Sequence, residues 1–274
     1  MALVTLTTDL GTRDFYLAAL KGAIISHCGN IPLMDVTHSI KPFDIKEAAF
    51  TVRNAYRYFP KGTIHLVHVN STDGKDKLLV AMLDGHYFIT FDNGFLSVAF
   101  EKTPHQTYQV NNELLEGNSL LYDDAIAKVI ELLEKEYKPS DFGHITTETV
   151  NYRLLQPICN KGSVRGTIVY VDHYGNAITN ISRKMFEDFI GEKRFTVIAN
   201  VGQTKIISKK YNEVEEGDMV CLFNSAGYLE VAMNKGKAEL LMGLKIDMPV
   251  MVIAQRAEMR QCQMFVEWIR VVFQ

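Results

Sequence analysis

The order of strand-like and helix-like segments constrains the fold of this chain more than any other feature. In the first half, short runs rich in β-branched residues alternate with helical patterns, beginning with a strand over residues 2–8, a helix over 14–28 and a strand over 31–36. A second helix over residues 45–59 carries apolar residues at three- and four-residue steps, and Pro60-Lys61-Gly62 ends it. This alternation predicts an α/β fold with a mostly parallel sheet covered by helices.

The first half contains further strands and one more helix. Residues 63–69, 78–83 and 87–90 have the composition of strands, and Asp84-Gly85 predicts a hairpin between the last two. A later helix is expected over residues 121–137, which place apolar side chains on one face.

The character of the sequence changes after Pro157, where helical periodicity fades. We therefore place the domain boundary there, with an α/β domain over residues 1–157 and a second domain over 158–274. Runs of strands separated by turn residues favour a small β-barrel or a sandwich for the second domain. The clearest of these strands are 167–171, 195–199, 219–223 and 249–254.

Composition excludes several classes of protein. The 274 residues include 29 Lys and Arg against 32 Asp and Glu, a formal net charge of -3, so no basic excess is present for binding nucleic acid. No apolar run reaches the roughly 18 residues that span a membrane, and no signal peptide is expected. The cysteines form no CxxC pair, which predicts neither a zinc site nor a disulfide framework and fits reduced thiols in the cytoplasm. They are Cys28, Cys159, Cys221 and Cys262.

A polar loop follows the first expected strand, at the edge where open α/β sheets bind ligands. It contains Asp9 and Asp14. A single glycine and no following Lys-Ser or Lys-Thr exclude a phosphate-binding loop, and an acidic loop suits ribose hydroxyls or a cation. Asp14 is also readable as the N-cap of the next helix. We expect Asp9 to serve a ligand and not the fold.

Two polar segments of the second half are further candidates. One runs from Val171 to Asn180 and the other from Asn224 to Glu230. A tight turn is by itself the commoner explanation of the first, because Gly and Asn residues often adopt the backbone conformations that turns require, and the second is equally readable as a turn.

Five stretches taken together resemble the S-adenosyl-L-methionine hydroxide adenosyltransferases, relatives of the fluorinating and chlorinating enzymes. They are TTDLGTRDFYLAALKGAI, MDVTHSIKPFDIKEAAF, DGHYFITFDNG, VDHYGNAITNI and FNSAGYLEVAMNKG. The resemblance spans nearly the whole chain. It implies an amino-terminal α/β domain that binds the adenosyl group and a carboxy-terminal β-barrel domain. It also implies a homotrimer, in which the barrel completes the site of a neighbouring subunit.

The resemblance assigns ligand-binding roles in both domains. In the first domain, Asp9 would accept hydrogen bonds from the ribose hydroxyls, while Asp14 and Phe43 would line the methionyl side.

In the second domain, four residues match the family pattern. Asp172 would meet the substrate amino group, and Ser225 would contact the methionine moiety. Tyr174 would stack on adenine, and Asn176 would hydrogen-bond the edge of the base.

The sequence departs from the family where the water-using members hold an Asp, an Arg and a His around the attacking water. Asn70 stands at the Asp position and Lys77 at the Arg position, and the His position is Leu120 or Leu121. An amide can orient water but cannot take its proton, lysine lacks the bidentate fork of arginine, and leucine offers neither function. His65 and His68 are poor substitutes, because three residues apart on a strand they point to opposite faces.

The resemblance implies hydrolysis of S-adenosylmethionine to adenosine and methionine, with no metal and no cofactor, and with Asn70 and Lys77 as remnants of the water site. The alternative is a trimeric protein that binds or senses S-adenosylmethionine or adenosine after turnover was lost. A halogenase is a third reading, but Ser225-Ala226-Gly227 follows the hydrolase-like version of the motif.

Overall fold

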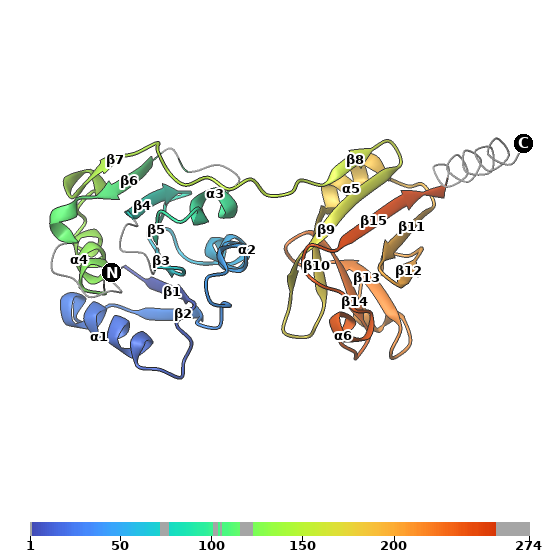
Figure 1. The fold of residues 1–274 in the computed structure, drawn as a ribbon, viewed down its shortest axis with the longest axis horizontal. Coiled ribbons are helices and arrows are strands. Elements are labelled where there is room, and N and C mark those ends of the chain that lie inside the picture. Colours follow the sequence, from blue (N-terminus) through green and yellow to red (C-terminus); the bar gives the residue numbers. More distant parts are fainter. Residues whose placement is uncertain (1, 72–76, 101–103, 105, 116–122, 256–274) are drawn as a thin grey trace, which may run out of the picture. The chain divides into compact units, whose positions relative to one another are not determined.

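The fold is known from a computed structural model, which describes residues 2–71, 77–100, 104, 106–115 and 123–255. The chain divides into two units, Met1–Leu154 and Leu155–Gln274. The sequence analysis placed its boundary between residues 157 and 158. Figure 1 shows a sheet with helices in the first unit and a strongly bent sheet in the second.

The first unit is built on a seven-stranded sheet with the order β2-β1-β3-β5-β4-β6-β7. The pairs along β2-β1-β3-β5 are parallel, and the pairs along β5-β4-β6-β7 are antiparallel. The α/β class is therefore confirmed, with the parallel pairing concentrated near the start of the chain. The strands are β1 (Val4–Thr8), β2 (Leu33–Thr37), β3 (Ile64–His68), β4 (Leu78–Leu83), β5 (His86–Phe91), β6 (Gln106–Val110) and β7 (Gly143–Ile145).

Helices cover both faces of this sheet. On one face α1 packs against α4, and on the other α2 packs against α3. Successive side chains of β3 point to opposite faces, so Leu66 joins the apolar cluster of α1 and α4 and Val67 joins that of α2 and α3. The helices are α1 (Tyr16–Cys28), α2 (Ile45–Ala55), η1 (Tyr56–Tyr58), α3 (Phe95–Ala99), η2 (Asn112–Leu114), α4 (Asp123–Glu134) and η3 (Pro139–Asp141).

The hairpin between β4 and β5 is confirmed. Leu83 pairs with His86, so the turn consists of Asp84 and Gly85 alone. Both turn residues have positive φ, 54° for Asp84 and 84° for Gly85. Positive φ at both central residues is the requirement of a type I′ turn, which Asp-Gly meets better than most dipeptides.

The second unit is an antiparallel, barrel-like sheet with the order β12-β11-β15-β9-β10-β14-β13, and β8 pairs with β9. Its two end strands approach each other, since a Cβ on Gly202 of β12 would lie 2.6 Å from Met219 Sδ of β13. The expected barrel is confirmed. Its strands are β8 (Ile158–Asn160), β9 (Ser163–Val171), β10 (Ala177–Ser182), β11 (Phe195–Ala199), β12 (Gly202–Thr204), β13 (Met219–Phe223), β14 (Tyr228–Met233) and β15 (Pro249–Ala254), and its helices are α5 (Arg183–Phe189), η4 (Tyr211–Glu213) and α6 (Ala238–Leu241).

The sequence analysis made predictions about the cysteines and about membrane-spanning segments. Cys28, Cys159 and Cys221 are free thiols, while Cys262 lies outside the described residues. Within the described ranges, no helix has the length and apolar character required to cross a bilayer.

Candidate functional site

Asp9 is the centre of the candidate site in the first unit. It directly follows β1, and its Oδ2 accepts hydrogen bonds from the backbone N–H of Phe43 at 2.9 Å and of Asn70 at 3.1 Å. Phe43 precedes α2, and Asn70 follows β3, the parallel neighbour of β1. One carboxylate oxygen therefore links two loops at the carboxyl ends of the parallel strands, the edge where such sheets bind ligands. It brings three of the predicted site residues together.

Both of the residues that donate to Asp9 have a positive φ. Phe43 has a φ of 69° and Asn70 a φ of 52°, in the left-handed region. This conformation is ordinary for Asn and unfavourable for Phe. Phe43 is 59% exposed. The hydrogen bonds to Asp9 thus stabilise a loop geometry that leaves an aromatic ring at the surface.

The second oxygen of Asp9 remains available. Among the described residues, Oδ1 of Asp9 has no hydrogen-bond partner, and the side chain is half-buried. A carboxylate oxygen at the carboxyl edge of a sheet is a suitable acceptor for vicinal hydroxyl groups such as those of ribose. Asp9 can therefore support the fold with one oxygen and a ligand with the other.

Asp14 does not cap the first helix. The N-cap of α1 is Phe15, with a helical φ of -77° and no side-chain hydrogen bond, so the interpretation of Asp14 as the cap is wrong. Asp14 is exposed in the loop between β1 and α1. Its contact with the methionyl group stays a prediction.

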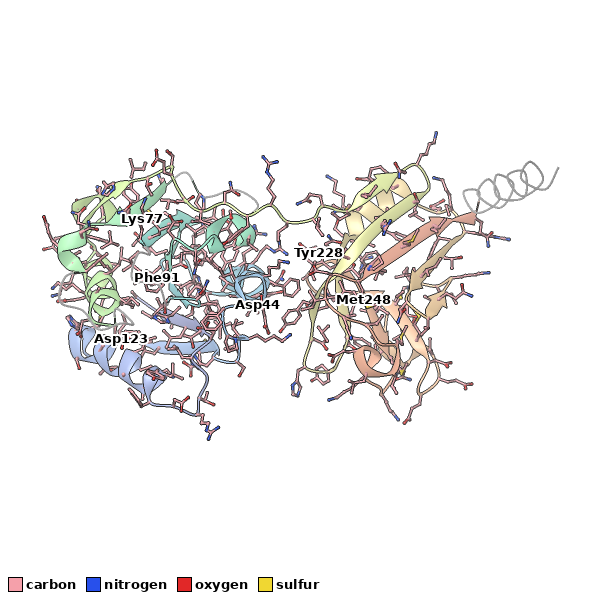
Figure 2. The ribbon with its side chains drawn as sticks, in the orientation of Figure 1. Asp44, Lys77, Phe91, Asp123, Tyr228 and Met248 are labelled. Atoms are coloured by element: carbon pink, nitrogen blue, oxygen red, sulfur yellow. The ribbon has the colours of Figure 1, made fainter. Side chains whose placement is uncertain are left out.

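The helix that follows Phe43 does carry a side-chain cap. Oδ1 of Asp44 accepts a hydrogen bond from Glu47 N at 2.9 Å and so fixes the start of α2. Figure 2 labels Asp44 at this helix start.

Asn70 and Lys77 stand on either side of residues 72–76, which are outside the described part of the chain. Asn70 is held by its bond to Asp9, and the preceding carbonyl of Val69 accepts from Asn93 Nδ2 at 2.8 Å. Lys77 is exposed directly before β4, and its carbonyl accepts from Asp92 N at 2.7 Å. The predicted His replacements, Leu120 and Leu121, lie outside the described residues.

His65 has a structural role. Its Nδ1 lies 2.7 Å from Thr5 Oγ1, its Nε2 lies 3.2 Å from His86 Nδ1, and the Tyr56 ring packs edge-on against it. Burial, followed by the neighbouring imidazole of His86, lowers the pKa of His65 to about 3. A neutral buried imidazole of this kind supports packing and does not exchange protons near neutral pH.

His68 faces the other side of the sheet, as the spacing predicts. Its ring packs edge-on against Phe91 at 5.5 Å, in the layer that contains α1 and α4. Burial raises the pKa of Asp123 at the start of α4, and the nearby His68 imidazole opposes that shift. Figure 2 labels Asp123 and Phe91 in this layer. The sequence analysis did not single out Asp123.

In the second unit, Asp172 organises the turn between β9 and β10. Its Oδ1 accepts from Tyr174 N at 2.9 Å and Asn176 N at 2.8 Å, and its Oδ2 accepts from Asn176 Nδ2 at 3.0 Å. The turn interpretation is therefore correct. It also leaves Tyr174 73% exposed, so the turn presents an aromatic residue beside a carboxylate.

Gly175 is required in this turn by both conformation and space. Its φ is 80°, and an added Cβ would lie 2.9 Å from Lys237 Cβ. The carbonyl of Gly175 accepts from Glu239 N at 2.9 Å, which joins the turn to the start of α6.

Ser225 lies in the turn between β13 and β14, where it is exposed. Oδ1 of Asn224 accepts from Ala226 N at 3.0 Å and from Tyr228 N at 3.1 Å, so the side chain of Asn224 fixes the loop that presents Ser225. Figure 2 labels Tyr228 at the end of this turn.

Glu230 ends one of the two candidate segments of the second half, but the sequence analysis gave it no role of its own. Only 2% of it is exposed, and Tyr211 Oη donates to its Oε1 at 2.7 Å. The available signal was one charged residue inside the apolar strand Tyr228–Met233.

A metal site is not formed by the described residues, among which no three His, Cys, Asp or Glu side chains gather around one point. The expectation that the protein needs no metal stays a prediction.

Proteins of known name match this chain along most of its length. A protein from Methanocaldococcus jannaschii named (R)-S-adenosyl-L-methionine hydrolase is 26% identical over 269 residues, covering 88% of this chain and 92% of its own. A protein of the same name from Thermus thermophilus is 28% identical, covering 90% and 97%. A fluorinase from an Actinoplanes species is 25% identical, covering 91% and 97%.

A solved structure and two domains of one protein family also match this chain. The crystal structure of an uncharacterized conserved protein from Thermotoga maritima has a TM-score of 0.82 at 25% identity, covering 92% of this chain and 100% of that one. The SAM hydroxide adenosyltransferase N-terminal domain matches residues 4–143, and the C-terminal domain of the same family matches residues 166–251. The chain belongs to the SAM hydroxide adenosyltransferase family.

Proposed function

We propose that this protein binds S-adenosyl-L-methionine and uses water to displace methionine from the adenosyl C5′, giving adenosine and L-methionine. Relatives named as hydrolases of this compound align with most of the chain. The observation that carries the proposal is the geometry of Asp9, whose Oδ2 fixes two loops of the ligand edge while its half-buried carboxylate keeps a second oxygen for ribose.

The chemistry of the step is a displacement at carbon. The bond between C5′ and sulfur breaks, and its electron pair stays on sulfur, which becomes the neutral thioether of methionine. The water oxygen bonds to C5′ and one proton passes to solvent. Because the sulfonium is already an activated leaving group, we propose that neither a cofactor nor a metal takes part. Alignment of water opposite the sulfur can contribute roughly 7–11 kcal/mol.

Slow turnover is expected, because Asn70 supplies an amide where a proton acceptor would assist the attacking water. The loss of acid-base assistance typically lowers a rate by about 10²–10⁴. The same substitution favours the second candidate, a protein that binds or senses S-adenosylmethionine or adenosine without turnover. Whether Asn70 and Lys77 can still assist the attacking water therefore decides between the hydrolase and the binding protein.

We also propose a homotrimer in which the second domain of one subunit completes the site on the first domain of another. Static light scattering tests this assembly, with the mass of three chains expected at micromolar concentration. A monomer that still binds ligand would contradict the proposed shared site. A cytoplasmic location completes the proposal, since the free thiols of Cys28, Cys159 and Cys221 suit a reducing compartment.

The activity is tested by incubating the protein with S-adenosylmethionine in ¹⁸O-labelled water. Equal amounts of adenosine and methionine are expected, with the label in the 5′ oxygen of adenosine and none in methionine. Binding of the substrate without release of adenosine would support the sensor, and absence of binding would contradict both candidates.

A second test restores the water site. The combined variant Asn70→Asp, Lys77→Arg and Leu121→His, with a parallel version carrying Leu120→His, should release adenosine about 10²-fold faster than the natural protein. The three changes are made together because residues that act as a unit are not additive. Asp tolerates the left-handed backbone of Asn70, so the first change fits the loop. If neither version gains activity while both bind the substrate, the binding protein is the better description.

A further inference from the structure

Glu230 lies where a carboxyl group is least expected, in the middle of a strand of the barrel. Its neighbours along β14, Leu229 and Val231, belong to the core of the second unit. Since successive side chains of a strand alternate, Glu230 points to the opposite face, where it is still only 2% exposed. The described residues offer it no Lys, Arg or His as an ion-pair partner; its partners are neutral, the Tyr211 hydroxyl at 2.7 Å and the side chain of Asn224. A buried acid without a cation favours its protonated form.

The strand register connects Glu230 to both turns of the candidate site. Glu230 pairs with Ile178 of β10 on one side and with Leu222 of β13 on the other. Two positions from these partners, directly beyond the ends of β10 and β13, lie Asn176 and Asn224, and the side chain of Asn224 hydrogen-bonds to Glu230. Asn176 is hydrogen-bonded to Asp172, and Asn224 shapes the loop of Ser225. Glu230 therefore lies between the two turns expected to meet the ligand.

The titratable groups around Glu230 come from three elements. They are Tyr211 of η4, Asp172 of the turn after β9, and Cys221 of β13. Burial first, and the negative charge of Asp172 as well, raise the pKa of Glu230, whereas hydrogen bonds from Tyr211 and Asn224 lower it. Burial, and next the charge of Glu230, raise the pKa of Cys221 to about 12, so this thiol stays protonated.

We propose that Glu230 couples the recognition of a positively charged amino group at Asp172 to the release of a proton. A bound ammonium group neutralises Asp172 and removes the repulsion that opposes ionisation of Glu230, which then loses its proton to solvent. The ligand class selected in this way is a nucleoside that carries an ammonium group, and a neutral nucleoside gains nothing. This inference rests on the proposed function, because it takes Asp172 to meet the amino group of S-adenosylmethionine.

The test uses S-adenosyl-L-homocysteine, which carries the amino group but no sulfonium, so no displacement adds protons of its own. Calorimetric titrations of the full chain in buffers of different ionisation enthalpy give the number of protons released on binding. The natural protein should release up to one proton per site, and its affinity should rise with pH by up to tenfold per unit across the titration of Glu230. Adenosine should release none.

Three variants identify the source of the proton. Glu230→Gln keeps an oxygen for the Tyr211 hydroxyl and should bind without proton release and with a flat pH profile. Tyr211→Phe removes a bond that favours the carboxylate, so the midpoint of the pH profile should move upward. Glu192→Gln, at an exposed site of the same unit, is the matched control and should behave as the natural protein.

The outcomes separate this inference from the proposed function. Equal proton release by the natural protein and Glu230→Gln, or no release by the natural protein, overturns the coupling and leaves hydrolysis untouched. Failure of S-adenosylhomocysteine to bind also overturns it. If binding releases a proton from Glu230 but the protein forms no labelled adenosine, the coupling is supported and the hydrolase function is refuted.

Discussion

Replacement of Asp9 tests whether one carboxylate supports both the fold and the ligand. Its Oδ2 accepts two backbone N–H bonds, from Phe43 and Asn70. A hydrogen bond to a charged group contributes about 1.5–3 kcal/mol, and because Asp9 is only half-buried we take the lower value for each bond. Asp9→Ala should therefore destabilise the two loops by about 3 kcal/mol. Asp9→Asn keeps one acceptor oxygen without its charge and should cause a smaller loss.

Hydrogen exchange followed by mass spectrometry measures this loss where it occurs. When the free energy of opening of a loop falls by about 3 kcal/mol, its amide exchange becomes about 100-fold faster. The peptides containing residues 43 and 70 should therefore exchange much faster in Asp9→Ala. Peptides from β11 of the other unit provide the internal control. Unchanged exchange at both loops would refute the reasoning. The two hydrogen bonds contradict only the part of the expectation that gives Asp9 no role in the fold, and its role toward a ligand stays a prediction.

Two further predictions concern acidity and the Asp172 turn. The pKa of His65 falls from 6.5 to about 3 on folding, so the unfolded chain binds more protons than the native one. The free energy of unfolding should thus decrease as the pH falls from about 6.5 toward 3, by at most about 1.4 kcal/mol per unit from this group. Urea midpoints at pH 7 and 5 should differ less in His65→Gln, and an equal difference would exclude His65 as the cause. Gly175→Ala places a Cβ 2.9 Å from Lys237 Cβ at a φ of 80°. The strained backbone alone should cost about 1–2 kcal/mol, so the urea midpoint should fall. Binding of S-adenosylhomocysteine should weaken about tenfold by calorimetry, and unchanged binding would remove the turn from the site.

Local sequence patterns predict the parts of this fold that local physics determines. The Asp84-Gly85 hairpin follows from the backbone preferences of two residues, and α2 follows from the spacing of its apolar side chains. The antiparallel half of the first sheet is different, because β6 pairs with β4 across β5 and α3 and with β7 across α4, and the pattern within each segment does not say which strands pair. The sequence therefore predicts a sheet with helices but not the order of all its strands.

The candidate site, like the fold, is only partly predictable from the sequence. Family motifs identify Asp9 and Asn70 but not their mutual contact, which joins residues 61 positions apart. Asp14 looks like an N-cap in the sequence, yet the helix begins one residue later than such a cap requires. Glu230 lies in a candidate segment, but its burial and its bond to Tyr211 could not be predicted, because Tyr211 comes from another element.

Phe43 combines two features that each disfavour a phenyl ring within an isolated domain. Its left-handed backbone costs a residue with a Cβ about 1–2 kcal/mol, and 59% of the residue is exposed to water. Glycine would relieve the strain, remove the exposed ring, and still donate its backbone N–H to Asp9. Selection for stability of the free protein alone would therefore replace this side chain. The predicted contact of Phe43 with the methionyl group would set binding against stability at this position.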